Sequence, residues 1–241
     1  MPAPAPVLAL WSVPRSRSTA FFRMMAERED VVSLHEPFAQ LADFGDALIG
    51  DRVVRSQAAA IEAIRLLAGN RRVFFKDTTD FRYPQVLADR RFLRETAHAM
   101  LIRHPRDVIP SHFALNPDLH VEDIGFTRLR ELWTAIVAAG QQPPLVLDSD
   151  SLLASPEATV RAYCAHMRLS FRPGPLTWAP GPRPEWARTR RWHVIASQSG
   201  GFDRAVHSDY RHTVDNNELL AEYCRHHMPS YDYLYQRRLI V

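Results

Sequence analysis

The chain has 241 residues, 46% of them hydrophobic and 24% charged, a balance that is typical of a folded protein and excludes an intrinsically disordered one. The formal net charge is +3, and the basic residues are scattered rather than clustered with aromatic residues, which argues against nucleic acid as a partner. No apolar run approaches the roughly 18 residues of a membrane-spanning helix, and the two cysteines cannot form a disulfide framework, so the sequence predicts a cytoplasmic protein with no membrane partner.

Apolar runs that suit buried strands alternate with helical patterns along the chain. The predicted strands are Val7–Val13, Val31–Leu34, Arg71–Phe75, Ala99–Ile102 and Pro144–Leu147. The predicted helices are Ala20–Arg28, Ser56–Ala68, one from Val108, Val121–Ala139, one opened by Ser155-Pro156-Glu157, and a mostly helical stretch from Asp215. This alternation predicts a single α/β domain over residues 1–241, with a parallel central sheet of about five strands flanked by helices on both faces.

Ligands of parallel sheets lie beyond the carboxyl ends of the strands, so the residues that follow the strands are the candidates for a site. These residues are Arg15–Thr19, His35–Glu36, Lys76–Asp77, Arg103–Arg106 and Asp148. The Pro-, Arg- and Trp-rich stretch Arg172–Arg191 lacks periodicity and is predicted to form a long loop that could act as a lid.

The turn after the first strand, Arg15-Ser16-Arg17-Ser18-Thr19, combines basic and hydroxyl side chains at the start of a helix. Ser18 or Thr19 is expected to cap that helix. The free N–H groups and the dipole of a helix N-terminus favour a phosphate-like anion, to which the hydroxyls can also donate. The turn lacks the glycines and the Lys-Ser/Thr pair of a Walker A motif. An ordinary strand–helix turn with a serine cap fits the spacing equally well.

A second strand–helix segment carries Arg103, Pro105, Asp107 and Ser111 at the spacing R-x-P-x-D-x-x-x-S. Together the two segments resemble the cofactor-binding signatures of the sulfotransferases that use 3′-phosphoadenosine 5′-phosphosulfate (PAPS), and the resemblance covers about Leu8–Leu115. It implies a P-loop-like fold, with Arg15–Thr19 around the 5′-phosphosulfate and Arg103 and Ser111 at the 3′-phosphate. Some bacterial members that sulfate small molecules have a similar Pro-Arg-Ser turn, and the acceptor expected for this chain is a bacterial secondary metabolite.

The chain departs from this family at three places. The usual first-turn lysine is Arg15 and the usual glycine is Arg17. Because a guanidinium does not release its proton near neutral pH, Arg15 is expected to act by its charge and not as an acid. The third signature, a Gly- and Lys-containing segment, is not recognisable in Arg188–Gly201, which lies where that signature is expected.

Sulfuryl transfer to a hydroxyl, or less readily to an amine, needs a base for the acceptor's proton. Members of the family use either a histidine or a glutamate, and the position of Glu36 makes it a slightly better candidate than His35. Both residues could instead be structural. Lys76, the only lysine, is predicted to contact the transferring sulfate or the acceptor, and the alternative is an ion pair with Asp77 or Asp80.

No metal ion is predicted, because fixed arginines can neutralise the charge of a sulfuryl group, and the expected nucleotide product is adenosine 3′,5′-bisphosphate. Asp148 ends a strand that resembles a Walker B strand, so a magnesium-dependent P-loop kinase or nucleotide hydrolase is the alternative function. More simply, Asp148 begins a loop that leads to Ser155. A non-catalytic anion-binding module is a third hypothesis. The oligomeric state is not predicted. Aromatic residues in the predicted loops are compatible with a small apolar or aromatic acceptor: Phe38, Phe44, Phe81, Tyr83 and Trp178.

Overall fold

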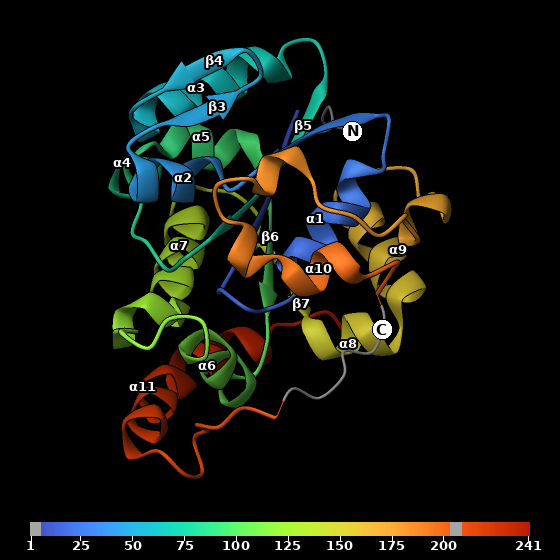
Figure 1. Ribbon diagram of the computed structural model, residues 1–241. Coiled ribbons are helices and arrows are strands. Elements are labelled where there is room, and N and C mark those ends of the chain that lie inside the picture. Colours follow the sequence, from blue (N-terminus) through green and yellow to red (C-terminus); the bar gives the residue numbers. More distant parts are fainter. Residues whose placement is uncertain (1–5, 203–208) are drawn as a thin grey trace.

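The computed structural model describes residues 6–202 and 209–241 and has a central sheet of five parallel strands (Figure 1). The strands are β1 (Val7–Ser12), β2 (Val31–His35), β5 (Arg72–Thr78), β6 (Thr96–Ile102) and β7 (Leu145–Asp148). Their order in the sheet is β2-β5-β1-β6-β7, so β1 lies in the middle and pairs with β5 on one side and β6 on the other. The five predicted strands and the α/β fold class are confirmed.

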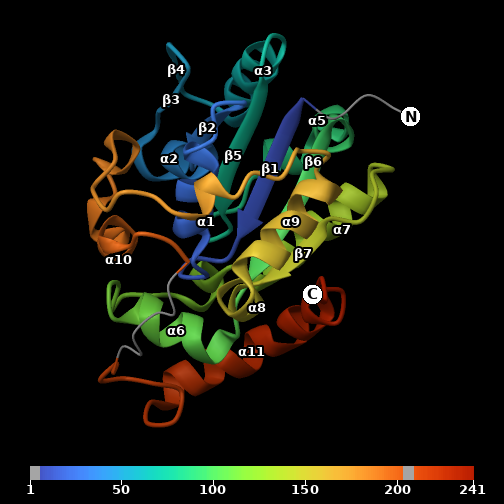
Figure 2. The same ribbon diagram turned by 90° about the vertical axis from the view of Figure 1, so that its right-hand side faces the viewer.

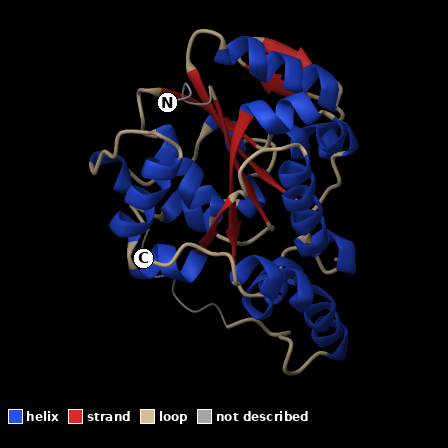
Figure 3. Ribbon diagram, turned by 180° about the vertical axis from the view of Figure 1, so that it is seen from behind, coloured by secondary structure: helices blue, strands red, loops and turns tan. Residues whose placement is uncertain are grey.

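The sheet buries both of its faces. Successive side chains of β1 point to opposite sides, so Ala9 and Trp11 belong to one hydrophobic cluster and Leu8 and Leu10 to the other. The first cluster is covered by α3 (Gln57–Ala68), α5 (Arg90–Glu95), α7 (Phe126–Ala138) and α11 (Glu218–Tyr235), and the second by α1 (Ser18–Ala26) and α9 (Pro156–His166). Figure 3 shows the strands as a middle layer between these helices. Double-sided burial explains why the strands are continuous apolar runs in the sequence.

The remaining elements connect these layers. The helices are α2 (Pro37–Phe44), α4 (Pro84–Ala88), α6 (Pro105–Phe113), α8 (Ser149–Ala154) and α10 (Val194–Gln198), and a separate antiparallel hairpin joins β3 (Ala47–Ile49) to β4 (Arg52–Val54). Within the two described ranges, no helix has both the length and the apolar character needed to cross a bilayer. The single-domain organisation of residues 1–241 stays a prediction, and residues 1–5 and 203–208 lie outside the described part.

Predicted element boundaries are wrong at several positions. Residues 121–139 do not form one helix, because a 3-10 helix η1 (Val121–Ile124) ends at Gly125, whose φ of 87° and whose close approach to the backbone of Thr79 exclude a side chain. Helix α6 begins at Pro105, not at Val108, because the fixed φ of proline suits the first helical position. Asp148 does not begin a loop: its Oδ2 accepts from the Ser151 amide at 2.9 Å and caps α8.

The stretch Arg172–Arg191 contains no α-helix or strand, as predicted. It contains the 3-10 helices η2 (Gly174–Leu176) and η3 (Pro184–Trp186) and runs into η4 (Arg190–Trp192). Arg188 ties it to the start of the hairpin through Asp46, 2.6 Å away, and Trp186 is buried. In Figures 1 and 2 the segment continues into α10, which lies beside α1. The stretch therefore lies next to the helix that follows β1.

Candidate functional site

The turn between β1 and α1, residues 13–17, has an unusual backbone, and we call it the anion turn. Arg15 and Arg17 adopt φ values of 61° and 68°, in the left-handed region that residues with a Cβ rarely enter. The hydroxyl of Ser16 is buried and donates to the Val13 carbonyl at 2.7 Å, which closes the turn. Figure 2 shows β1 with its arrowhead directed towards the side of the molecule that holds α6 and α8.

The N-terminus of α1 has no side-chain cap. Arg17 occupies the cap position, and Ser18 and Thr19 lie inside the helix, so the prediction that one of these two hydroxyls caps it is wrong. The left-handed backbone at Arg17 brings the chain into the helix without the extended residue that a serine or threonine cap requires. The first amides of α1 therefore have no side-chain acceptor among the described residues and can donate to an anion.

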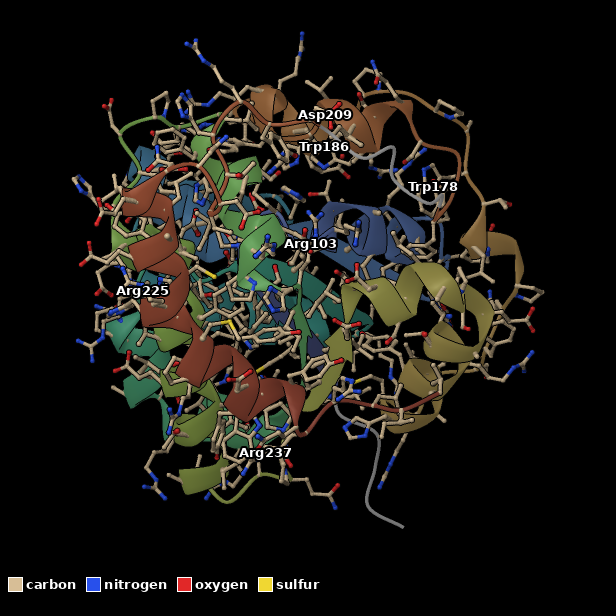
Figure 4. All side chains as sticks on the ribbon, turned by 90° about the horizontal axis from the view of Figure 1, so that it is seen from below. Arg103, Trp178, Trp186, Asp209, Arg225 and Arg237 are labelled. Carbon is tan, nitrogen blue, oxygen red and sulfur yellow. The ribbon has the colours of Figure 1, made fainter. Side chains whose placement is uncertain are left out.

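The second predicted segment contacts the anion turn directly. Arg15 Nε donates to Ser111 Oγ at 3.0 Å, and Arg103 Nη1 donates to the Arg15 carbonyl at 3.3 Å. Arg103 directly follows β6 and Ser111 lies in α6, so the adjacency of β1 and β6 brings the two segments together. In the view from below, Arg103 lies near the middle of this face (Figure 4). The structure thus places Arg15, Arg103 and Ser111 in one site.

These guanidinium groups are poorly compensated by carboxylates. Burial lowers the pKa of Arg15, and burial together with the nearby charge of Arg17 lowers the pKa of Arg103. The Nε of Arg103 is buried and has no hydrogen-bond partner among the described residues. A buried donor on a cation is costly unless an acceptor reaches it. The arrangement therefore suits an anionic ligand.

Arg17 differs from the other two arginines. Its Nη1 lies 2.8 Å from Asp150 Oδ1 and 3.2 Å from Ser149 Oγ, both in α8. The side chain thus points to the helix after β7, and only the backbone of this residue belongs to the anion turn. Two of the predicted cofactor-binding side chains are thus engaged elsewhere: Arg17 with α8, and the Ser16 hydroxyl with the Val13 carbonyl inside the turn.

The predicted base candidates lie beside Lys76. Strands β2 and β5 are neighbours, with His35 opposite Lys76 in the register, and the Glu36 amide donates to the Lys76 carbonyl at 2.7 Å. Lys76 lies inside β5 and not after it, because the strand extends to Thr78. Its ammonium is ion-paired with Glu36 Oε1, and it is 1% exposed. The partner of Lys76 is thus Glu36, and neither Asp77 nor Asp80.

The protonation states of this group follow from burial and charge. Burial would raise the pKa of Glu36, but the Lys76 ammonium and the two nearby histidines outweigh it and hold the pKa at about 2. Burial lowers the pKa of His35 to about 3 although the Glu36 charge opposes this. Neither ring nitrogen of His35 has a hydrogen-bond partner in the described part of the chain. At neutral pH the site therefore offers a charged carboxylate and a neutral imidazole, and both can accept a proton.

The structure adds His193, to which the sequence gives no role. Its Nδ1 lies 3.2 Å from Thr19 Oγ1, and its ring contacts that of His35 edge-on, with 4.8 Å between centroids. The preceding carbonyl, of Trp192, accepts from Arg15 Nη1 at 2.8 Å. His193 follows a stretch without periodicity, and its only signal in the sequence is its place in the segment where the family's third signature is expected.

One group of side chains could offer metal ligands. His35, Glu36 and His193 present two imidazoles and a carboxylate whose ligand atoms lie within 4.8 Å of one another. The ammonium of Lys76 already neutralises the carboxylate of Glu36, however, and both nitrogens of His193 lie within hydrogen-bond distance of threonine hydroxyls. Glu36 and His193 are thus already engaged with protein partners, which does not favour a metal ion here.

The aromatic residues suggested for the acceptor mostly belong to the core. Phe38 and Tyr83 pack against Trp11, and Trp178 packs edge-on against Phe202. Phe44 lies under the guanidinium of Arg188, 3.9 Å from its ring centroid. Phe44, at the end of α2, is thus exposed and contacts Arg188 of the long loop.

The family model described as "Sulfotransferase domain" matches residues 7–237. The Arabidopsis thaliana protein named "Branched-chain-amino-acid aminotransferase-like protein 2" is 28% identical over 207 residues, which cover 81% of this chain and 36% of that protein. The chain thus spans about a third of the length of the curated relatives that it matches.

Two solved structures share the fold at low identity. A sulfotransferase from Alicyclobacillus acidocaldarius is 12% identical, with a TM-score of 0.55 over 99% of this chain and 98% of its own. The sulfotransferase domain from the curacin biosynthetic pathway is 12% identical, with a TM-score of 0.51 over 94% of this chain and 98% of its own. The central sheet and its helices are thus the P-loop-like fold of these sulfotransferases. With a family match over nearly its whole length, the chain belongs to the sulfotransferase domain family.

Proposed function

We propose that the chain transfers a sulfuryl group from PAPS to a hydroxyl, less readily an amine, of a small molecule. The observation that carries this proposal is the hydrogen bond from Arg15 to Ser111, together with that from Arg103 to the Arg15 carbonyl. These contacts bring the two signature segments together, which supports a common nucleotide site. A nucleotide with phosphate groups at both ends can therefore be held by both segments at once.

The residues present fit such a nucleotide. The anion turn and the uncapped amides of α1 would hold the 5′-phosphosulfate, with donors from Ser18 and Thr19. Arg103, whose buried Nε lacks a partner in the described residues, and Ser111 would hold the 3′-phosphate. When bound, PAPS supplies the activated sulfuryl group. Arg15 stabilises the negative charge that develops on the leaving phosphate, and it does so without releasing a proton.

The acceptor's proton goes to the pair at the end of β2. Glu36 or His35 accepts the hydroxyl proton while the new oxygen–sulfur bond forms and the bond between sulfur and the bridging phosphate oxygen breaks. The products are a sulfate ester and adenosine 3′,5′-bisphosphate. Lys76 keeps Glu36 ionised and offers a fixed positive charge beside the transferring group. These cations take the place of a metal ion in the proposal.

The acceptor is proposed to be a small hydroxyl compound of the bacterial cytoplasm, with apolar or aromatic character. The exposed side chain of Phe44 and the Arg188 guanidinium over its ring support this proposal. We propose the same activity for any longer protein of which this chain is a part.

Calorimetric titration tests the proposed function most directly. Adenosine 3′,5′-bisphosphate should bind below millimolar concentration without magnesium, and adenosine 5′-monophosphate, which lacks the 3′-phosphate, should bind more weakly. Absence of bisphosphate binding would overturn the proposal. Magnesium-dependent binding of ATP in its place would favour the kinase or nucleotide hydrolase alternative.

A further inference from the structure

His193 lies between the first turn of α1 and His35, one of the two base candidates. Its side chain is buried, at 4% exposure. One ring nitrogen, Nδ1, lies 3.2 Å from Thr19 Oγ1 in the first turn of α1, and the other, Nε2, lies 3.0 Å from Thr189 Oγ1. The hydrogen bond from Arg15 to the Trp192 carbonyl holds the neighbouring backbone. The three side chains therefore form a continuous line of hydrogen bonds, Thr189–His193–Thr19, that ends in the first turn of α1, next to the anion turn.

The imidazole is neutral in the working pH range. Burial lowers the pKa of His193 to about 4; the Glu36 charge opposes this shift, and the charges of Lys76 and Arg15 add to it. A neutral imidazole has one N–H donor and one nitrogen that only accepts. The two hydrogen bonds of His193 must therefore run in the same direction along the line, either from Thr189 towards Thr19 or from Thr19 towards Thr189.

Only one of these two directions lets Thr19 donate a hydrogen bond to an anion bound at the anion turn. The oxygens of a sulfuryl or phosphoryl group only accept, so Thr19 contributes to binding only if its hydroxyl proton is free to be donated. That requires Nδ1–H to donate to Thr19 Oγ1, and Nε2 to accept from the hydroxyl of Thr189. In the opposite direction, Thr19 would give its proton to His193 and present lone pairs to the anion.

We propose that His193 is a positioning residue for sulfuryl transfer, which together with Thr189 directs the hydroxyl proton of Thr19 at the transferring group. This inference rests on the proposed function, and in it His193 acts on the transferring group through Thr19. It requires the Nδ1–H tautomer of His193, and it assigns a role to Thr189, a residue of the long loop. The loop then contributes to the site through a defined chain of hydrogen bonds.

The tautomer can be measured without any nucleotide. Long-range proton–nitrogen NMR on protein labelled with ¹⁵N-histidine at pH 7 distinguishes a protonated Nδ1 from a protonated Nε2, and loss of the signal in His193→Asn assigns it. We expect Nδ1–H in the wild type and in Thr189→Ser, and a shift towards Nε2–H in Thr189→Val. A wild-type protein in which His193 carries its proton on Nε2 would overturn the proposed positioning role.

Turnover supplies the second readout. Thr189→Val should lower kcat about tenfold, as expected for one weakened hydrogen bond in the transition state. Its affinity for adenosine 3′,5′-bisphosphate, which carries no sulfuryl group, should stay that of the wild type. Thr189→Ser should restore most of the turnover, and His193→Asn, whose amide can donate to Thr19, should keep more of it than His193→Leu.

The control is Thr134→Val, which removes an exposed hydroxyl on α7 that donates to the Arg130 carbonyl at 3.0 Å. It should leave kcat unchanged. A Thr189→Val protein with wild-type kcat would overturn the proposed positioning role of His193 and Thr189. Failure of the proposed function appears differently, as a wild-type protein that does not bind the bisphosphate whatever the tautomer of His193.

Discussion

The ammonium of Lys76 is ion-paired with Oε1 of Glu36 across two adjacent parallel strands, and both side chains are buried. A buried ion pair is costly to break from one side, because the remaining charge loses its compensation. The same pair holds the candidate base in its ionised form. Stability and catalysis should therefore respond differently to substitutions of its two members.

Lys76→Met should lower the free energy of unfolding by about 3 kcal/mol, since it leaves the carboxylate of Glu36 buried without a partner. Adding Glu36→Gln to Lys76→Met should recover a large part of this loss. Urea denaturation measures both effects. The matched control is Arg82→Met, which breaks an exposed pair with Glu131 and should change stability by less than about 1 kcal/mol. Equal losses in the two single variants would contradict the burial argument.

Glu36→Gln should reduce kcat by a factor on the order of a hundred or more, because the amide cannot accept the acceptor's proton. Affinity for the bisphosphate should be unchanged, since the described contacts of the Glu36 side chain are with Lys76 and His35 and not with the residues proposed to hold the phosphates. Steady-state kinetics and calorimetry on the same preparation check the two statements. Full turnover in this variant would transfer the role of the base to His35, with His35→Asn as the deciding variant.

Arg103→Ala should weaken binding of adenosine 3′,5′-bisphosphate by about thirtyfold, which corresponds to a charge-assisted contact of about 2 kcal/mol. Helix α6, which follows Arg103, offers a control in Arg106→Ala, which removes an exposed guanidinium paired with Asp215. Calorimetry should show nearly wild-type affinity for this control. Similar affinities for both variants would remove Arg103 from the nucleotide site.

The pH dependence of kcat/KM should lack the loss near pH 6.5 that an ordinary histidine base produces. The pKa of Glu36 is about 2 and that of His35 about 3, so both bases stay unprotonated as the pH falls from 8 to 5. Initial rates over this range, with circular dichroism to verify folding at each pH, test the expectation. A midpoint between pH 6 and 7 would show that the working base is another group.

His98 should make the fold sensitive to acid. It is buried, its Nδ1 accepts from Trp11 Nε1 at 3.1 Å, and burial lowers its pKa to about 4. The unfolded chain takes up this proton as the pH falls through about 6.5 and the folded chain does so only near pH 4, so the stabilisation is complete above pH 6.5 and is lost between these values.

The free energy of unfolding should fall by about 3 kcal/mol because of His98 as the pH falls from about 6.5 to about 4. Urea denaturation at pH 7 and at pH 4.5 should therefore show a smaller decrease in His98→Gln than in the wild type. Identical decreases in the two proteins would mean that His98 titrates normally in the folded state.

The strands were predictable because a parallel sheet covered on both faces requires continuous apolar runs, and the placement of the site followed from the rule that ligands lie beyond the carboxyl ends of such strands. Helix boundaries were harder. Pro105 begins a helix instead of preceding one, and Gly125 divides a pattern that is periodic throughout. In both cases one residue's backbone preference decides the boundary against the periodicity around it.

Side-chain partners depended on the strand order, which the sequence does not reveal. Lys76 meets Glu36 only because β5 lies beside β2, and Arg17 meets Asp150 only because the helix after β7 approaches the turn after β1. His193 comes from a segment without periodicity and is placed by the packing of Trp186 and by the hydrogen bond from Arg15. Such contacts between distant segments follow from the tertiary structure and leave no local pattern.

The left-handed backbone of Arg17 has a wider effect than its local strain. In the family that this chain resembles, glycine is usual at this position, and glycine would adopt a φ of 68° freely. Arginine adopts it at a cost, but its side chain reaches Asp150 and so tethers α8, at the far border of the sheet, to the loop that opens the first helix. A glycine here would relax the main chain and remove that contact, so in this protein a single side chain links the middle of the binding edge to its β7 border.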